Sequence, residues 1–378
     1  MNEIEGLVRV AIGVCGFLIF NLRLRKAFYS SLRERPSSSR RLDVSIVVPA
    51  RDEAGNLPSL LNTVAALDPG PAEVIVVDDH SSDDTAAIAT SFGVRVVVPE
   101  QLPAGWVGKP WACAAGAAAA SSSLLLFTDA DTVHSPDLLS RATQALEDRQ
   151  ADLVSVLPSH LVVATWERFQ GIFQLLLLVA ARAGSARARG ERCFCIGQFL
   201  LVRRAAYERV GGHAAVRNRV AEDLGMAHLI ERHGLRFALL HAAGALRVRM
   251  YPRGLQSFVS GWQRNFREGM RAAGVSGILE TVLVLGWLLD VPRWLLQACW
   301  SQNHLSMGLA IFASALTCFT IARWQRQVGA FRARDAVAYP VFTLLFVLIS
   351  GLALADHILR KPVTWRGRST AADELGLG

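Results

Sequence analysis

The sequence is poor in cysteine and lacks the common metal-binding and DNA-binding patterns. Six cysteines occur in 378 residues, and Cys193 and Cys195 do not have the spacing of a zinc site. Buried free thiols are therefore expected rather than a disulfide framework. The net charge is +8, but no zinc-finger spacing and no basic helix with heptads accompany it. No nucleic-acid partner is expected.

Charged residues are also scarce, at 19% of the chain, whereas hydrophobic residues make up 52% and the mean hydropathy is +0.30. The apolar residues are concentrated in a few runs, which indicates membrane segments. Many arginines stand beside these runs, and that arrangement suits an anionic membrane surface.

The first apolar run covers residues 7–22 and is followed by the cations Arg23, Arg25 and Lys26. No small-residue cleavage site follows the run, and the cations lie on the wrong side for a signal peptide. Residues 1–26 are therefore expected to be a membrane anchor whose C-terminal end lies in the cytoplasm.

Residues 27–43 are expected to be a linker, and residues 44–274 a domain in which strands alternate with helices. Such alternation predicts right-handed crossovers and a mainly parallel sheet. The expected strands cover residues 44–48, 73–77, 94–98, 124–127, 153–156 and 193–202.

Residues 124–131 combine an apolar run with an Asp-x-Asp turn. Residues 124–127 predict a strand buried on both faces, and Asp129 and Asp131 follow it directly. Two hard oxygen ligands at that spacing suit Mg²⁺ or Mn²⁺ carrying a diphosphate. An acidic turn or helix cap is the simpler alternative for an isolated pair.

Other carboxylates also follow strands, which weakens that alternative. Glu53 comes after the first expected strand, and Asp78 and Asp79 end the second. The carboxyl ends of parallel strands share one edge, which is where open α/β sheets bind ligands. Clustered carboxylates repel one another unless cations or hydrogen-bond donors compensate.

Residues 275–358 are expected to form a C-terminal transmembrane region, followed by a basic tail at residues 359–378. Residues 305–322 and 336–355 are each about one membrane thickness long. Polar residues interrupt residues 278–300. Three spans after a cytoplasmic domain would place the basic tail outside, against the positive-inside tendency. Either residues 278–300 form a broken, non-spanning pair of helices, or another segment spans.

Eight segments together resemble family 2 glycosyltransferases, which have a GT-A catalytic fold, and within them a membrane-bound group that includes a carotenoid-pathway enzyme. The segments are residues 47–53 (VVPARDE), 76–83 (VVDDHSSD), 105–112 (GWVGKPWA), 127–131 (FTDAD), 197–201 (GQFLL), 211–213 (GGH), 222–223 (ED) and 364–368 (TWRGR). Processive members carry Gln-x-x-Arg-Trp, whereas here Phe266 stands three residues after Gln263. The resemblance therefore implies a single sugar transfer rather than polymer synthesis.

By this resemblance the chain is an inverting enzyme that moves a sugar from a nucleotide sugar, with UDP as the expected nucleotide, to a membrane-associated lipid such as a carotenoid or other isoprenoid. The nucleotide-sugar-binding residues would be Pro49, Glu53, Asp78, Lys109 and Asp129. Asp131 would hold Mg²⁺ or Mn²⁺. The acceptor or diphosphate side would comprise Gln198, Glu222, Trp262, Gln263 and Arg264.

The resemblance points to Asp223 as the catalytic base. Adjacent helical residues point about 100° apart, so we expect only one of Glu222 and Asp223 to face the site. If the acceptor is a carboxylic acid, it is already ionised near neutral pH, and Asp223 would then orient it.

Two other classes of protein are alternatives to this assignment. A non-catalytic membrane scaffold could keep a degenerate transferase fold, although the acidic ligands, Lys109 and the candidate base are all present. A nucleotidyltransferase would need a Gly-rich phosphate loop, which residues 49–53 do not form. The expected location is the cell (inner) membrane, as a multi-pass protein with its catalytic domain in the cytoplasm.

Overall fold

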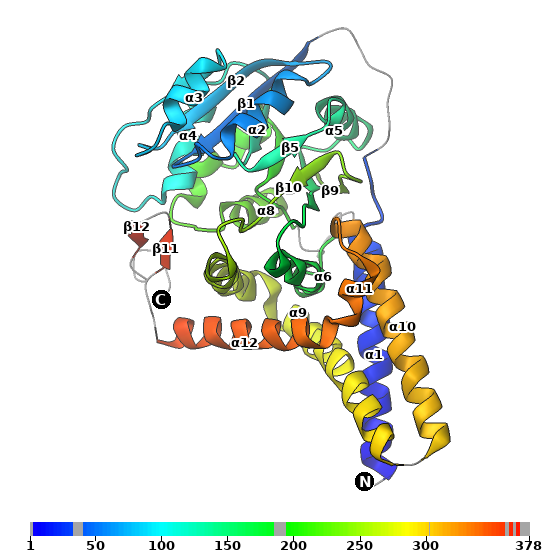
Figure 1. Ribbon diagram of the computed structural model, residues 1–378. Coiled ribbons are helices and arrows are strands. Elements are labelled where there is room, and N and C mark those ends of the chain that lie inside the picture. Colours follow the sequence, from blue (N-terminus) through cyan, green and yellow to red (C-terminus); the bar gives the residue numbers. More distant parts are fainter. Residues whose placement is uncertain are drawn as a thin grey trace. The chain divides into compact units, whose positions relative to one another are not determined.

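The computed structural model describes residues 3–32, 41–184, 194–301, 303–359, 363–365 and 368–370, which belong to two compact units (Figure 1). The sheet unit comprises residues 29–159, 184–249 and 358–378, and the helical unit comprises residues 1–28, 160–183 and 250–357. Residues 160–183 and 250–274, expected to belong to one contiguous α/β domain, therefore lie in the helical unit. Residues 33–40 of the expected linker, Cys193 and most of the basic tail lie outside the described residues.

The sheet unit is built on a seven-stranded mixed sheet with the order β3-β2-β1-β4-β8-β6-β9. Its strands are β1 (Leu42–Ala50), β2 (Pro71–Asp78), β3 (Arg95–Val97), β4 (Leu124–Thr128), β6 (Leu153–Leu157), β8 (Phe199–Arg203) and β9 (Phe237–His241). The pairs β1–β2, β2–β3, β1–β4 and β6–β9 are parallel, whereas β8 runs antiparallel to both β4 and β6. The expected mixed, mainly parallel sheet is confirmed.

The sheet unit also contains the helices α2 (Leu57–Ala65), α3 (Thr85–Ser91), α4 (Gly108–Ala119), α5 (Leu138–Asp148), α7 (Arg204–Arg209) and α8 (Glu222–Arg232). Helix α4 lies very close to the sheet at Gly116, where an added Cβ would be 2.9 Å from Cγ2 of Val77. Glycine at this position therefore lets α4 pack tightly on β1 and β2. This close packing sets the distance between the N-terminal residues of α4 and the sheet.

The strand register brings the acidic turns to one edge. Ala50 of β1 is paired with Asp78 of β2, and Val47 of β1 is paired with Phe127 of β4. The loops after these three strands therefore open side by side. After β4 the chain enters the short strand β5 (Thr132–His134), which pairs antiparallel with β10 (Leu246–Val248).

The helical unit contains α1 (Glu3–Ala27), α6 (Gln170–Ala180), α9 (Leu255–Trp300), α10 (His304–Val328), α11 (Ala333–Val337) and α12 (Tyr339–Ile358). Four segments of the described chain are long and apolar enough to cross a membrane: Ile4–Ala27, Ala273–Trp300, His304–Val328 and Tyr339–Ile358. Helix α9 continues through Pro292, and its non-helical residue is Gly274. The expected alternative of a broken helix pair within residues 278–300 is therefore wrong.

Ion pairs between α1 and α9 explain the polar residues that interrupt this run. Arg9 Nη2 lies 2.9 Å from Asp290 Oδ1, and Arg23 forms a second ion pair with Glu280. Between these pairs the ring of Phe17 packs edge-on against Trp287. Charges in a membrane helix are tolerated when they pair inside the bundle, as these two ion pairs do.

Candidate active site

Lys109 connects three elements of the sheet unit. It is the second residue of α4, and its Nζ lies 2.8 Å from Oδ1 of Asp129 and 2.7 Å from Oε1 of Glu222. Asp129 follows β4, and Glu222 begins α8. Burial opposes the charge of Lys109, but the two carboxylates outweigh this effect and hold the pKa of Lys109 well above its usual value. The ammonium thus compensates the negative charge at this edge.

Asp223 is held by backbone donors. Its Oδ2 accepts a hydrogen bond of 2.8 Å from the Gly197 amide, and its Oδ1 accepts one of 2.8 Å from the Leu224 amide. Burial raises the pKa of Asp223, and the Lys109 charge and these two amides oppose the rise. The carboxylate is therefore fixed in orientation.

Gly197 leaves room for this cluster. A Cβ at Gly197 would lie 3.0 Å from Nζ of Lys109, 3.2 Å from Oε1 of Glu222 and 3.3 Å from Oδ2 of Asp223. Oxygen atoms of Glu222 and Asp223 therefore both lie near Gly197, with Glu222 buried, and that only Asp223 faces the substrate stays a prediction. The longer Glu222 side chain reaches Lys109, while Asp223 turns towards the amide of Gly197.

Asp131 has a carboxylate oxygen that accepts no hydrogen bond from any described residue. Its Oδ1 is buried without a hydrogen-bond partner among the described residues. Burial raises the pKa of Asp131 to about 7, and repulsion from Asp129 and Glu53 adds to the rise, while Lys109 opposes it. A buried carboxylate oxygen beside further carboxylates fits a hard divalent cation. The described side chains do not form a group of three metal ligands by themselves, so further oxygen ligands would come from the substrate.

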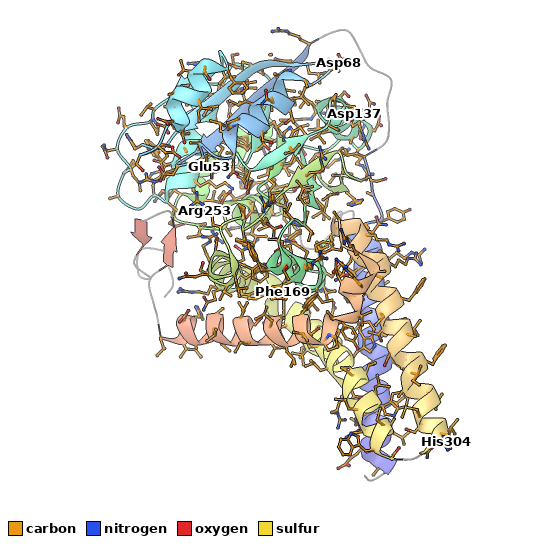
Figure 2. The ribbon with its side chains drawn as sticks, in the orientation of Figure 1. Glu53, Asp68, Asp137, Phe169, Arg253 and His304 are labelled. Atoms are coloured by element: carbon orange, nitrogen blue, oxygen red, sulfur yellow. The ribbon has the colours of Figure 1, made fainter. Side chains whose placement is uncertain are left out.

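The expected nucleotide-binding residues lie at the ends of β1 and β2. Glu53, labelled in Figure 2, accepts a hydrogen bond of 2.7 Å from the Asn56 amide group. Asp78 is buried and accepts a hydrogen bond of 3.3 Å from the Ser81 backbone amide. Pro49 is paired in register with Val77, one residue before Asp78.

Hydrogen bonds join the loops after β1 and β2. The Oδ1 atom of Asp52 accepts bonds from the amide and hydroxyl of Ser82, at 2.7 and 3.0 Å. Arg51 donates to the backbone oxygen of Asp79 at 2.7 Å. Sequence reasoning missed Arg51 and Gly197. The signal for Arg51 was its place as a cation beside clustered acids.

The remaining expected residues divide between the two units. Gln198 lies at the sheet edge, where its carbonyl accepts a hydrogen bond of 2.8 Å from Oγ1 of Thr128. Trp262, Gln263 and Arg264 lie on α9 in the helical unit. The Nε2 of Gln263 donates to Oδ2 of Asp356 at 3.4 Å.

Trp262 is a packing residue in this structure. Its side chain is 0% exposed, its indole N–H donates to Oε1 of Gln170 at 2.9 Å, and its ring packs against Phe173 and Phe266. The expectation that it borders an acceptor does not agree with this burial, because surrounding aromatic side chains cover the ring.

A mixed sheet with this acidic edge defines the GT-A class of glycosyltransferase folds. A mannosyltransferase from Pyrobaculum calidifontis, determined with GDP-Man and Mn²⁺, shares this fold with a TM-score of 0.54 and 18% identity, over 89% of this chain and 98% of that one. Residues 45–211 match the model of glycosyl transferase family 2. Residues 45–211 are thus similar to the catalytic domain of family 2 glycosyltransferases, and the sheet unit has the GT-A fold.

Curated relatives agree with this assignment. The 4,4'-diaponeurosporenoate glycosyltransferases of Staphylococcus aureus strains USA300 and MRSA252 are each 28% identical to it over 365 residues, which cover 94% of this chain and 93% of the relative. The similarity therefore extends beyond the family 2 domain into the apolar helices.

Proposed function

We propose that the protein transfers a sugar, with inversion, from a nucleotide diphosphate sugar to a membrane-associated lipid. The observation that carries this proposal is the cluster at the sheet edge, where Lys109 joins Asp129 to Glu222 while Asp131 keeps a buried oxygen that has no partner among the described residues. Such a cluster combines a candidate metal ligand, a fixed cation and an acidic group within one small volume.

For the donor, we propose a UDP-sugar held by Pro49, Glu53 and Asp78 on the nucleoside side. Asp131, assisted by Asp129, would hold Mg²⁺ or Mn²⁺, which would neutralise charge on the leaving diphosphate. The fold neighbour determined with GDP-Man and Mn²⁺ supports a metal-bound sugar nucleotide, and it makes GDP the second nucleotide to test.

For the acceptor, we propose an isoprenoid or carotenoid lipid, because the curated relatives are named for 4,4'-diaponeurosporenoate. An acceptor oxygen forms a bond to the anomeric carbon from the face opposite the leaving group. The bond to the diphosphate breaks, and the diphosphate keeps the electron pair. A hydroxyl acceptor gives its proton to Asp223, whereas a carboxylate acceptor has no proton to give and is oriented by Asp223.

For the location, we propose a multi-pass protein of the cell membrane whose sheet unit faces the cytoplasm. The cations Arg23, Arg25 and Lys26 at the C-terminal end of α1 support this orientation. A cysteine introduced at Ser82 should react with a membrane-impermeant maleimide only after cells are permeabilised. Labelling in intact cells would contradict the orientation.

The function is tested with the full chain in membranes, which is incubated with UDP-sugars and GDP-sugars and with lipid extracts that contain carotenoid carboxylates. Mass spectrometry should show a lipid that gains one sugar residue, and the product should be absent in excess EDTA. Donor binding without any glycosylated product would instead support the non-catalytic scaffold.

A further inference from the structure

Helix α12 runs across the direction shared by α1, the second half of α9 and α10 within the helical unit (Figure 1). Helices α1 and α10 pack along α9, and the three form an elongated bundle. By length and composition α12 could span a membrane as they could. Its direction differs from theirs, however, and helices that cross one bilayer side by side are tilted by only about 20° on average.

One face of α12 packs on aromatic residues of the helical unit. Phe342 contacts the ring of Phe169 at 4.9 Å, and Phe346 contacts those of Phe173 and Phe266 at 5.2 and 4.8 Å between centroids. Near the end of α12, Asp356 accepts the hydrogen bond from Gln263. Helix α12 therefore rests on α6 and on the first half of α9.

The opposite face of α12 is apolar and uncovered. Leu344, Leu348 and Leu352 stand four residues apart and are 58%, 59% and 43% exposed, and Val341 is 63% exposed. Such spacing places them on one side of the helix. An exposed apolar stripe along a whole helix indicates an interaction surface.

Helix α9 bends at Gly274. The backbone of this residue has φ 60° and ψ 176°, a conformation that is essentially confined to glycine. Before it lies the segment that supports α12, and the apolar segment Ala273–Trp300, which packs along α1, begins at this bend. The bend therefore separates the part of α9 under α12 from the part that can cross the bilayer.

The charges at the C-terminal end of α10 and just before α12 indicate which side of the membrane α12 occupies. Arg323 and Arg326 in the last turns of α10, and Arg332 and Arg334 after it, are exposed, and such cations favour the cytoplasmic side. After α12, the hairpin of β11 (Val363–Trp365) and β12 (Arg368–Thr370) belongs to the sheet unit. If α12 crossed the membrane, this hairpin and the basic tail would lie on the side opposite Arg323–Arg334.

We propose that α12 does not cross the membrane but lies in the plane of its cytoplasmic surface, with the stripe of Val341, Leu344, Leu348 and Leu352 inserted among the lipids. The occupant of this face is the lipid bilayer. Helices α1, α9 and α10 then make three crossings, and the basic tail stays on the side of the sheet unit. This arrangement removes the conflict between the number of apolar helices and the positive-inside tendency. It rests on the cytoplasmic orientation proposed above.

The depth of α12 is measured on the full chain in vesicles of phosphatidylcholine and phosphatidylglycerol. Leu344, Leu348 or Leu352 is replaced by a single cysteine that carries a fluorophore. The fluorescence is then quenched by lipids that carry nitroxides at different depths of the bilayer. In-plane insertion predicts the same shallow depth for all three. A spanning helix predicts a change of about 12 Å from residue 344 to residue 352, at 1.5 Å per residue. That gradient would overturn the proposal, as would absence of lipid quenching, which would point to a second protein copy on this face.

Matched controls lie on α10. Cysteines at Leu309 and Leu316, both exposed, should differ in depth by about 10 Å. The native cysteines are replaced by serine. If that chain does not fold, the buried Cys113 and Cys195 are kept, because they are shielded from the label.

The side of the tail is tested separately, with a cysteine appended after Gly378 and a membrane-impermeant maleimide. Ser82→Cys reports the side of the sheet unit, and Ser301→Cys reports the loop between α9 and α10. We expect the tail cysteine to react like Ser82→Cys and unlike Ser301→Cys. A tail that reacts like Ser301→Cys would show that α12 crosses the membrane. Failure of the proposed orientation is distinguishable, because it would exchange the behaviour of the two controls.

Discussion

The ammonium of Lys109 lies 2.7 Å from the carboxylate of Glu222, so the start of α4 and the start of α8 are joined by an ion pair. Glu222 is buried. A buried ion pair contributes little beyond an apolar contact, but the loss of one partner leaves an uncompensated buried charge. The pair should therefore behave as a unit in both stability and activity.

Lys109→Met should destabilise the sheet unit by about 3 kcal/mol, because Glu222 would keep a buried charge without its partner. Adding Glu222→Gln should restore part of the loss. Unfolding of the full chain in detergent measures both variants and the coupling between them. Additive losses would show that the two side chains do not act as a pair.

Asp131→Asn should abolish metal-dependent transfer while the fold remains. The variant removes a candidate cation ligand, and it also removes repulsion from Asp129 and Glu53, so the unfolding temperature should not fall. Binding of Mn²⁺ followed by electron paramagnetic resonance should be lost together with activity. Full transfer in excess EDTA, or by the variant, would remove the metal role from Asp131.

Asp223→Asn should lower turnover with a hydroxyl acceptor by about 10²–10⁴-fold, because the variant lacks the proposed general base. Donor binding should change little, since in the proposed function the nucleoside of the donor is held by the loops after β1 and β2. With a carboxylate acceptor the loss should be much smaller. Turnover at the parent rate with a hydroxyl acceptor would move the role of base to Glu222, and the pH dependence of Glu222→Gln would test that outcome.

The contribution of two buried histidines to the stability of the sheet unit should decrease as pH falls from about 6.5 to 5. Burial lowers the pKa of His134 and of His213 to about 3, below the usual value of about 6.5. Between these values the unfolded chain binds the proton and the folded chain does not, so stability decreases with falling pH by about 1.4 kcal/mol per pH unit for each histidine.

Unfolding of the parent chain and of His134→Gln at several pH values measures this effect. The raised pKa of Asp131 and that of Glu222 act in the opposite direction, so the histidine contribution is the difference between the two slopes. Equal slopes would show that His134 does not contribute.

The sequence alone determined the acidic edge of the sheet. Strands buried on both faces appear as continuous apolar runs, and the carboxylates that follow them must emerge where those strands end. The sequence therefore assigns Asp78, Asp129 and Asp131 to one edge of the sheet. The long apolar helices could be found in the same way, because membrane thickness sets their length.

Only the tertiary structure decided which partners these residues have. The contact of Lys109 with Glu222, the approach of Asp223 to Gly197 and the pairing of Asp290 with Arg9 each join segments far apart in the chain. Local patterns carry no information on such distances. The sequence did not predict the short strands β5, β9 and β10 for a related reason. The apolar pattern of so few residues does not identify the type of element.

The direction of α12 shows the same limit most clearly. Its apolar length fits a membrane span, and nothing in its own residues distinguishes a crossing helix from one that lies in the membrane plane. The difference comes from Phe169, Phe173 and Phe266, which hold one of its faces on other helices. Hydrophobic length is a property of the segment, whereas orientation is set by what the segment packs against.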